Sequence, residues 1–184
     1  MRIVAGEWRG RKLAAPSGEL TRPTADRTRE TLFNMLNSRL GSFEGLSVVD
    51  LFAGSGALGL EALSRGAASC LFVEQESTAI KAIKANIEKL DARTRSTVQQ
   101  ASVMALAPAK RAHDLILLDP PYDTSAGAVA LDRLLRLGWI ERSTWIALET
   151  GAKDAVEVKS LHCVAERRVG KARLWLLRLD PDAA

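Results

Sequence analysis

From residue 46 onward, short apolar runs alternate with segments in which apolar residues recur every three to four positions. The runs predict buried strands, and the recurring positions predict amphipathic helices. Strands are expected at 46–52, 69–74, 94–100, 114–119 and 144–149, and helices at 57–65, 77–91 and 126–137, with a short helical piece ending at 111. Apolar strands that alternate with helices are typical of a parallel sheet covered on both faces.

The two ends of the chain depart from this alternation. Two strand-like segments, 162–168 and 172–179, predict an antiparallel hairpin added to the edge of the sheet. At the other end, 1–14 predicts a short hairpin, 15–25 a loop and 26–40 a helix. We therefore expect an α/β fold: a doubly wound, mostly parallel, seven-stranded Rossmann-like sheet with a small N-terminal β-hairpin arm. The expected division is a basic arm with its loop at 1–25 and a main domain at 26–184.

Positive charge is concentrated near the N-terminus. Residues 1–40 hold eight Lys and Arg against four acids, whereas the remaining residues hold 18 of each. Such an excess predicts a polyanion partner such as nucleic acid, with an ordinary solvated face as the alternative. Arg9, Arg11 and Lys12 are the candidate phosphate contacts, and Trp8 either stacks on a base or packs the arm.

Composition argues against a membrane protein and against a metal site. No run approaches the ~20 apolar residues of a membrane span, and the first residues show no signal-peptide core. The two cysteines and two histidines stand apart, without the spacing of metal ligands. We expect a cytoplasmic protein with no metal and no membrane partner.

A glycine-rich turn follows the first of the 46–149 strands. Asp50 lies at the tip of that strand, just before the turn, and 54–59 (Gly-Ser-Gly-Ala-Leu-Gly) matches the pattern of dinucleotide-binding turns. Glu74 ends the next strand, where a carboxylate accepts the hydroxyls of a ribose. Asp50 narrows the choice of cofactor, because an anion repels a pyrophosphate but attracts a sulfonium and an ammonium. The turn therefore favours S-adenosylmethionine over NAD.

The tetrapeptide Asp119-Pro120-Pro121-Tyr122 ends the apolar run 115–118. At a strand tip it predicts a rigid lip that holds a planar, amine-bearing ring. The side chain of Asp119 and the carbonyl of Pro120 are expected to accept the two amine hydrogens. Pro121 stiffens the lip, and Tyr122 offers a face for stacking. These four residues are the candidate catalytic group, and by themselves they leave guanine, adenine and cytosine open.

Together, 50–56, Glu74 and 119–122 resemble the three main motifs of class I S-adenosylmethionine-dependent methyltransferases that modify exocyclic base amines. Segments 2–13 and 21–34 narrow this resemblance to the RsmD family of bacterial small-subunit (16S) rRNA guanine-N2 methyltransferases. The resemblance implies methyl transfer to an rRNA guanine, with S-adenosylhomocysteine as product. It also implies a monomer that acts on a partly assembled ribosomal subunit. Because the 119–122 motif is shared more widely, an adenine-N6 or cytosine-N4 methyltransferase of DNA or RNA stays open.

The resemblance also assigns roles residue by residue. The residues expected around the cofactor are Asp50, Phe52, Ala53, Gly54, Gly56, Glu74, Gln75, Ser102 and Asp119. The Ser102 hydroxyl, or a backbone amide of the same loop, is expected to replace the acid that many class I enzymes place near the adenine. The expected RNA contacts are Arg9, Arg11, Lys12, Arg22 and Arg27. Arg29 and Glu30 are interpreted as a surface pair on the first helix.

Overall fold

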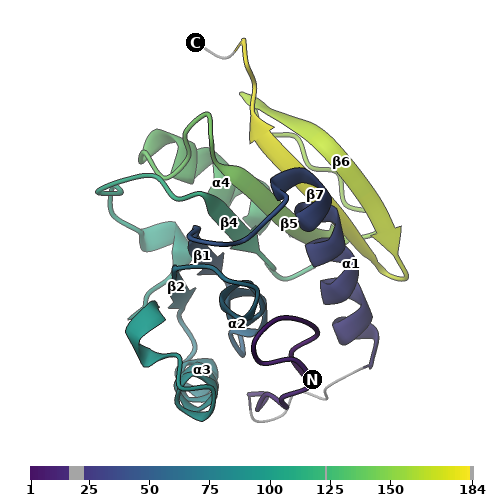
Figure 1. Ribbon diagram of the computed structural model, residues 1–184. Coiled ribbons are helices and arrows are strands. Elements are labelled where there is room, and N and C mark those ends of the chain that lie inside the picture. Colours follow the sequence, from purple (N-terminus) through teal and green to yellow (C-terminus); the bar gives the residue numbers. More distant parts are fainter. Residues whose placement is uncertain (17–22, 123, 183–184) are drawn as a thin grey trace.

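The computed structural model describes residues 1–16, 23–122 and 124–182 (Figure 1). The helices are α1 (Pro23–Leu40), α2 (Ala57–Ser64), α3 (Ser77–Lys89) and α4 (Ala126–Arg136), with 3-10 turns at Arg93–Arg95 and Val103–Ala105. The strands are β1 (Ser47–Leu51), β2 (Ser69–Glu74), β3 (Ser96–Gln100), β4 (Leu115–Leu118), β5 (Trp145–Gly151), β6 (Leu161–Val169) and β7 (Ala172–Leu179). No helix among the described residues is long and apolar enough to cross a membrane.

The strands form one sheet in the order β3-β2-β1-β4-β5-β7-β6. The first five are parallel, β7 pairs antiparallel with β5, and β6 pairs antiparallel with β7. The chain winds outward from β1 to β3 and then returns to place β4 on the other side of β1. Ligands of open α/β sheets bind at the carboxyl ends of the strands beside such a reversal. The predicted fold class is confirmed, with the closing hairpin at the sheet edge.

The sheet separates two hydrophobic clusters, which explains why its central strands are apolar at consecutive positions. In β1, Val48 packs into one cluster and Val49 into the other. In β4, Leu115 and Ile116 divide in the same way. Helices α1, α2 and α3 cover the first face and α4 covers the second (Figure 1). Because both faces are covered, neither side of these strands carries the polar alternation of a solvated sheet.

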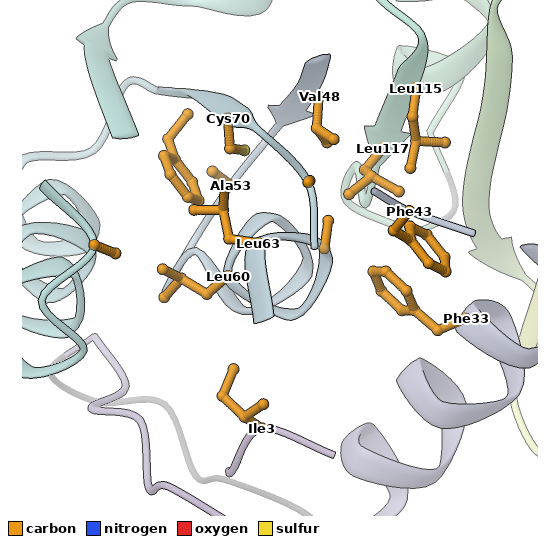
Figure 2. Close-up of a cluster of buried hydrophobic side chains, with 14 of the residues drawn as sticks. Ile3, Phe33, Phe43, Val48, Ala53, Leu60, Leu63, Cys70, Leu115 and Leu117 are labelled. Carbon is orange, nitrogen blue, oxygen red and sulfur yellow. The ribbon is translucent and has the colours of Figure 1, made fainter. Parts of the chain in front are cut away.

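The N-terminal segment 1–16 packs against the first cluster. Its side chains Ile3, Trp8 and Leu13 are buried there, and Figure 2 shows Ile3 pointing toward α2. The segment folds back on itself, but the predicted hairpin is reduced to one isolated antiparallel bridge between Arg2 and Lys12. Of the two roles considered for Trp8, the structure therefore shows the packing role.

Three buried polar side chains, Glu61, Ser64 and Asn86, hold the N-terminal segment by its backbone. Glu61 of α2 accepts from the amides of residues 4 and 5 at 2.8 and 3.0 Å. Ser64 accepts from the amide of residue 8 at 3.0 Å, and Asn86 of α3 from that of residue 14 at 2.7 Å. Such bonds fix the segment, because buried amides are seldom left unpaired. The domain boundary at 25 stays a prediction, next to residues 17–22 outside the described range.

Several element boundaries differ from the sequence expectations, including those of α1, of β3 and of the helical piece before 111. Helix α1 begins at Pro23 instead of 26, as the fixed φ of proline suits a first helical turn. Strand β3 begins at Ser96 instead of 94, because Arg93–Arg95 forms a 3-10 turn. The helical piece expected before 111 is limited to Val103–Ala105.

Candidate active site

A cavity of about 780 Å³ opens at the carboxyl edge of the parallel strands. It is lined by the ends of β1, β2, β4 and β5, by α1 and by the first residue of the chain. The predicted site residues in its lining are Asp50, Phe52, Ala53, Gly54, Glu74, Gln75, Asp119, Pro120, Pro121 and Tyr122. Outside the lining lie Gly56 and Ser102 and the exposed Arg9, Arg11, Lys12 and Arg27. Arg22 falls outside the described residues.

Asp50, in the penultimate position of β1, is a buried carboxylate with one satisfied oxygen. Its Oδ2 accepts from the amide of Gly59 at 2.8 Å, while Oδ1 has no hydrogen-bond partner. Burial raises the pKa of Asp50 to about 8; the Gly59 amide opposes this shift and the charge of Glu74 adds to it. A buried, unpartnered carboxylate oxygen is costly by itself. A cation bound in the cavity would offset that cost and favour the ionised form.

The glycines of the turn have different physical roles. Gly56 adopts φ 78° immediately before α2, a left-handed conformation that glycine tolerates best. At Gly59, a Cβ would lie 2.4 Å from Phe72 Cε1 and 2.6 Å from Cys70 Sγ, so only glycine lets α2 approach β2 this closely. At Gly54, which lines the cavity, a Cβ would meet no atom within 4 Å. The space that a side chain would fill there is open to a ligand.

Glu74, at the end of β2, already holds three backbone amides. Its Oε1 accepts from Gln75 at 2.7 Å and Glu76 at 2.9 Å, and its Oε2 accepts from Gly54 at 2.8 Å. Each carboxylate oxygen has two lone pairs. One lone pair therefore remains, on Oε2, for a ligand hydroxyl. For Glu74 to accept hydrogen bonds from both hydroxyls of a ribose, one of the three amides must either break its bond to Glu74 or share a lone pair with a hydroxyl.

The adenine contact predicted for Ser102 meets a competing role. The Ser102 hydroxyl accepts from the amide of Met104 at 3.3 Å and caps the 3-10 turn Val103–Ala105. Its neighbours Ala101 and Val103 line the cavity instead. A planar ring placed here would thus meet mainly apolar surface from this loop, and the role of Ser102 stays a prediction.

The lip 119–122 stands at the end of β4, as the sequence predicts. Pro120 is buried, whereas Asp119, Pro121 and Tyr122 are exposed, with Tyr122 at 40%. The Thr124 hydroxyl donates to the Pro121 carbonyl at 2.7 Å, which braces the turn after the lip. An acid and an aromatic ring thus face the same cavity from one rigid segment.

Glu149 of β5 is a cavity residue that sequence reasoning overlooked. It accepts a short hydrogen bond from the Tyr122 hydroxyl. Burial raises the pKa of Glu149, opposed by the Tyr122 hydroxyl and by the charge of Arg29. Burial likewise raises the pKa of Tyr122, and its bond to Glu149 adds to the shift. The signal was present in the sequence, because Glu149 ends a predicted strand just as Asp50, Glu74 and Asp119 stand at strand ends.

Arg29 also lines the cavity, and its interpretation as a surface residue is wrong. It is only 4% exposed and pairs with Asp26 at 2.9 Å and with buried Glu61 at 3.6 Å. It also donates to the backbone carbonyl of Arg2. Arg29 therefore joins α1, α2 and the N-terminal segment beside the cavity. These partners are distant in sequence, so the pattern of α1 alone could not reveal them.

The fold is that of the class I S-adenosylmethionine-dependent methyltransferases, and the cavity lies at the carboxyl edge of its parallel strands. The same architecture occurs in the solved structure of yhhF, a proposed methyltransferase from Escherichia coli. That structure is 31% identical to this chain, with a TM-score of 0.81 and 98% of each chain covered.

The particular family follows from sequence comparison. The model of the family described as Conserved hypothetical protein 95 matches residues 1–178, and the chain belongs to this family. Ribosomal RNA small subunit methyltransferase D of Escherichia coli (strain K12) is 36% identical over 85% of this chain and 77% of that protein. The protein of the same name from Haemophilus influenzae is 39% identical over 82% and 78%. The resemblance to the RsmD family is thereby confirmed.

Proposed function

We propose that the protein transfers a methyl group from S-adenosylmethionine to the exocyclic N2 amine of a guanine in small-subunit ribosomal RNA. One observation carries the proposal: a single cavity joins the acidic, glycine-rich half around Asp50 to the lip at 119–122. The names of the relatives support ribosomal RNA as the substrate. We also expect a monomer that acts in the cytoplasm on a partly assembled subunit.

The residues of the first half fit the cofactor. The unpartnered Asp50 Oδ1 suits a cationic group, and the open space at Gly54 allows close approach to its backbone. The remaining lone pair of Glu74 suits a ribose hydroxyl. S-adenosylmethionine, when bound, supplies a methyl group on a cationic sulfur, and the electron pair of the broken S–C bond stays on that sulfur to give S-adenosylhomocysteine.

The second half would hold the amine that receives the methyl group. Guanine N2 is a weak nucleophile because its lone pair is delocalised into the ring, so alignment matters more than a strong base. Asp119 and the Pro120 carbonyl accept the two amine hydrogens and direct the nitrogen lone pair at the methyl carbon. Asp119 stabilises the positive charge that grows on nitrogen as the N–C bond forms. The surplus proton then leaves to Asp119 or to water.

Tyr122 and the basic arm would bind the RNA. The target base leaves its stack to enter the cavity and stacks on Tyr122, a contact worth ~1–3 kcal/mol in comparable sites. Arg9, Arg11 and Lys12 are exposed on the N-terminal segment, where they can contact phosphates. Deleting the segment is a poor test, because it would also remove core side chains such as Ile3.

Charge-neutralising substitutions test the arm more cleanly. Arg9→Gln combined with Lys12→Gln should weaken RNA binding and lower the slope of log affinity against log salt by about 0.7–0.9 per lost phosphate contact. Lys159→Gln is the matched control, since Lys159 is exposed and precedes β6 at the opposite edge of the sheet. An unchanged salt slope in the double variant would refute the role of the arm.

The substrate itself is tested by supplying radiolabelled S-adenosylmethionine with naked rRNA, partly assembled small subunits and duplex DNA. Digestion to nucleosides then identifies the methylated base. We expect label on N2-methylguanosine from RNA. Label on adenine N6 or cytosine N4 would instead support the alternative, which the shared lip 119–122 also allows.

A further inference from the structure

Glu149 and the lip 119–122 occupy neighbouring positions at the same edge of the sheet. Strands β4 and β5 are parallel, and their last paired residues are Leu118 and Leu148. Asp119 and Glu149 therefore each follow directly on a paired position, on strands about 4.8 Å apart. Both residues line the cavity. A base whose amine is held by Asp119 can therefore place the neighbouring ring atom of its hydrogen-bonding edge beside Glu149.

The hydrogen bonding of Glu149 matches one base better than the others. Beside its exocyclic amine, guanine carries a second donor, the N1–H. Adenine and cytosine instead carry an unprotonated ring nitrogen beside the amine, which accepts. An ionised carboxylate accepts hydrogen bonds and cannot donate them. A carboxylate next to the lip thus suits guanine and leaves two acceptors facing each other with adenine or cytosine.

We infer that Glu149 is a specificity-determining residue whose carboxylate accepts the N1–H of the target guanine. The inference rests on the proposed function and names the contact by which that site selects its base. The lip holds the N2 hydrogens and Glu149 holds N1–H, so the two strand ends together read the donor edge of guanine. Sites built to hydrogen-bond a polar group reject analogues that lack it strongly, because their own polar groups are then left unpaired.

Two neighbours orient the Glu149 carboxylate and favour its ionised, accepting form against the effect of burial, which raises the pKa of Glu149. The Tyr122 hydroxyl donates to Oε1 and so fixes the rotamer of the carboxylate. The charge of Arg29 and this hydroxyl both oppose the effect of burial on Glu149. Tyr122 consequently has two roles in base binding. Its ring is the stacking face, and its hydroxyl orients Glu149.

The test uses RNA that carries 2-aminopurine at the methylated position in place of guanine. 2-Aminopurine keeps the amine at position 2, but its N1 is an acceptor. The wild-type protein should prefer guanine in kcat/KM by about ten- to hundredfold, the range of one well-placed polar base contact. Glu149→Gln should narrow or invert this preference, because its amide oxygen still accepts from Tyr122 while its NH2 donates to N1 of 2-aminopurine. The preference is a ratio within one protein sample, so partial misfolding cancels.

Tyr122→Phe provides the matched comparison, since it keeps the ring and removes only the hydroxyl that orients Glu149. It should reduce the guanine preference less than Glu149→Gln does. If Glu149 merely positioned Tyr122, the Gln variant would keep the wild-type preference, and that result would overturn the inference. Wild-type labelling of a base other than guanine would instead refute the proposed function.

Binding gives a readout that does not need turnover. The fluorescence of 2-aminopurine is quenched when the base stacks, so a titration of the substituted RNA reports its entry into the site. Glu149→Gln should bind this RNA more tightly than the wild type does, relative to guanine RNA measured by competition. Equal relative affinities in the two proteins would count against Glu149 even if the variant were catalytically inactive.

Discussion

The two halves of the cavity are held in different ways. In the cofactor half, the carboxylates of Asp50 and Glu74 bind backbone amides: Gly59 for the first, and Gly54, Gln75 and Glu76 for the second. In the base half, the described bond between Tyr122 and Glu149 joins two side chains from neighbouring strands. In the cofactor half, the same carboxylates that face the ligand also hold the backbone of the glycine turn in place. The base half depends instead on a contact between two side chains from neighbouring strands.

This difference predicts where function and stability separate. Substitutions in the cofactor half remove groups that also hold the turn and the start of α3, so they should affect both ligand affinity and folding. In the base half, the described bond between Tyr122 and Glu149 joins two side chains and holds no turn. Substitutions there should therefore affect turnover or base choice and leave folding nearly intact.

Asp119→Ala is expected to give the largest effect. Loss of the group that aligns the amine and stabilises its developing charge should lower kcat by about 100- to 1000-fold. Most of the cofactor affinity should remain, as measured by calorimetric titration. Asp132→Ala, at a surface position of α4 outside the cavity lining, is the control and should leave kcat unchanged. Complete loss of cofactor binding in Asp119→Ala would contradict the division between the two halves.

Asp50→Asn should abolish a pH dependence of cofactor binding. With its pKa raised to about 8, Asp50 is largely protonated at pH 6 in the cofactor-free protein. A bound cation favours the carboxylate, so wild-type affinity should rise with pH by up to about tenfold per unit and level off above 8. Asparagine cannot ionise but can still accept from Gly59. The affinity ratio of wild type to variant between pH 6 and 9 isolates Asp50, because titration of the ligand itself cancels.

The same shift predicts a slope in stability. A folded pKa above the unfolded 3.8 means that the folded state binds more protons between pH 4 and about 8. The contribution of Asp50 to the free energy of unfolding is therefore fully present below pH 4 and is lost as the pH rises toward 8. Thermal unfolding of the cofactor-free protein should show this decline, and Asp50→Asn should flatten it. Identical slopes in the two proteins would argue against a neutral Asp50.

Glu74→Gln should reduce stability as well as affinity. Glutamine keeps one accepting oxygen, so at least one of the amides of Gly54, Gln75 and Glu76 loses its partner. An unsatisfied buried donor costs about 1–3 kcal/mol, and these part-buried amides should fall at the lower end of that range. Urea unfolding should show a loss in this range, together with weaker cofactor binding. Gln75→Ala is the control for the stability measurement alone, since Gln75 lines the cavity but is exposed, and its amide bond to Glu74 does not need its side chain. If Glu74→Gln were as stable as the wild type, the bonds from the Glu74 carboxylate to backbone amides would not be what holds the cofactor half together.

The same contrast explains what the sequence could predict. The strands, the glycine turn and the lip were predictable because each is local: apolar runs, positions that demand glycine, and prolines at a strand end. The place of Glu149 at a strand end was visible in the sequence, but its contact with Tyr122 was not. The burial of Arg29 was not visible either, because both features depend on partners far along the chain. Burial of Arg29 requires Glu61 of α2 and the backbone of residue 2, and the contact of Glu149 requires the register of β4 with β5. Residues that act through the packing of distant elements leave little local pattern.

Tyr122→Phe is expected to give the smallest effect on folding. Tyr122 is 40% exposed, so losing the hydrogen bond that its hydroxyl donates to Glu149 should change stability by less than about 1 kcal/mol. Its ring remains available for stacking, and turnover on guanine RNA should fall only modestly. Paired urea-unfolding curves of Tyr122→Phe and Glu74→Gln would measure the contrast directly. A larger stability loss in Tyr122→Phe would show that the side-chain bridge between β4 and β5, and not the backbone-bound carboxylates, holds the cavity together.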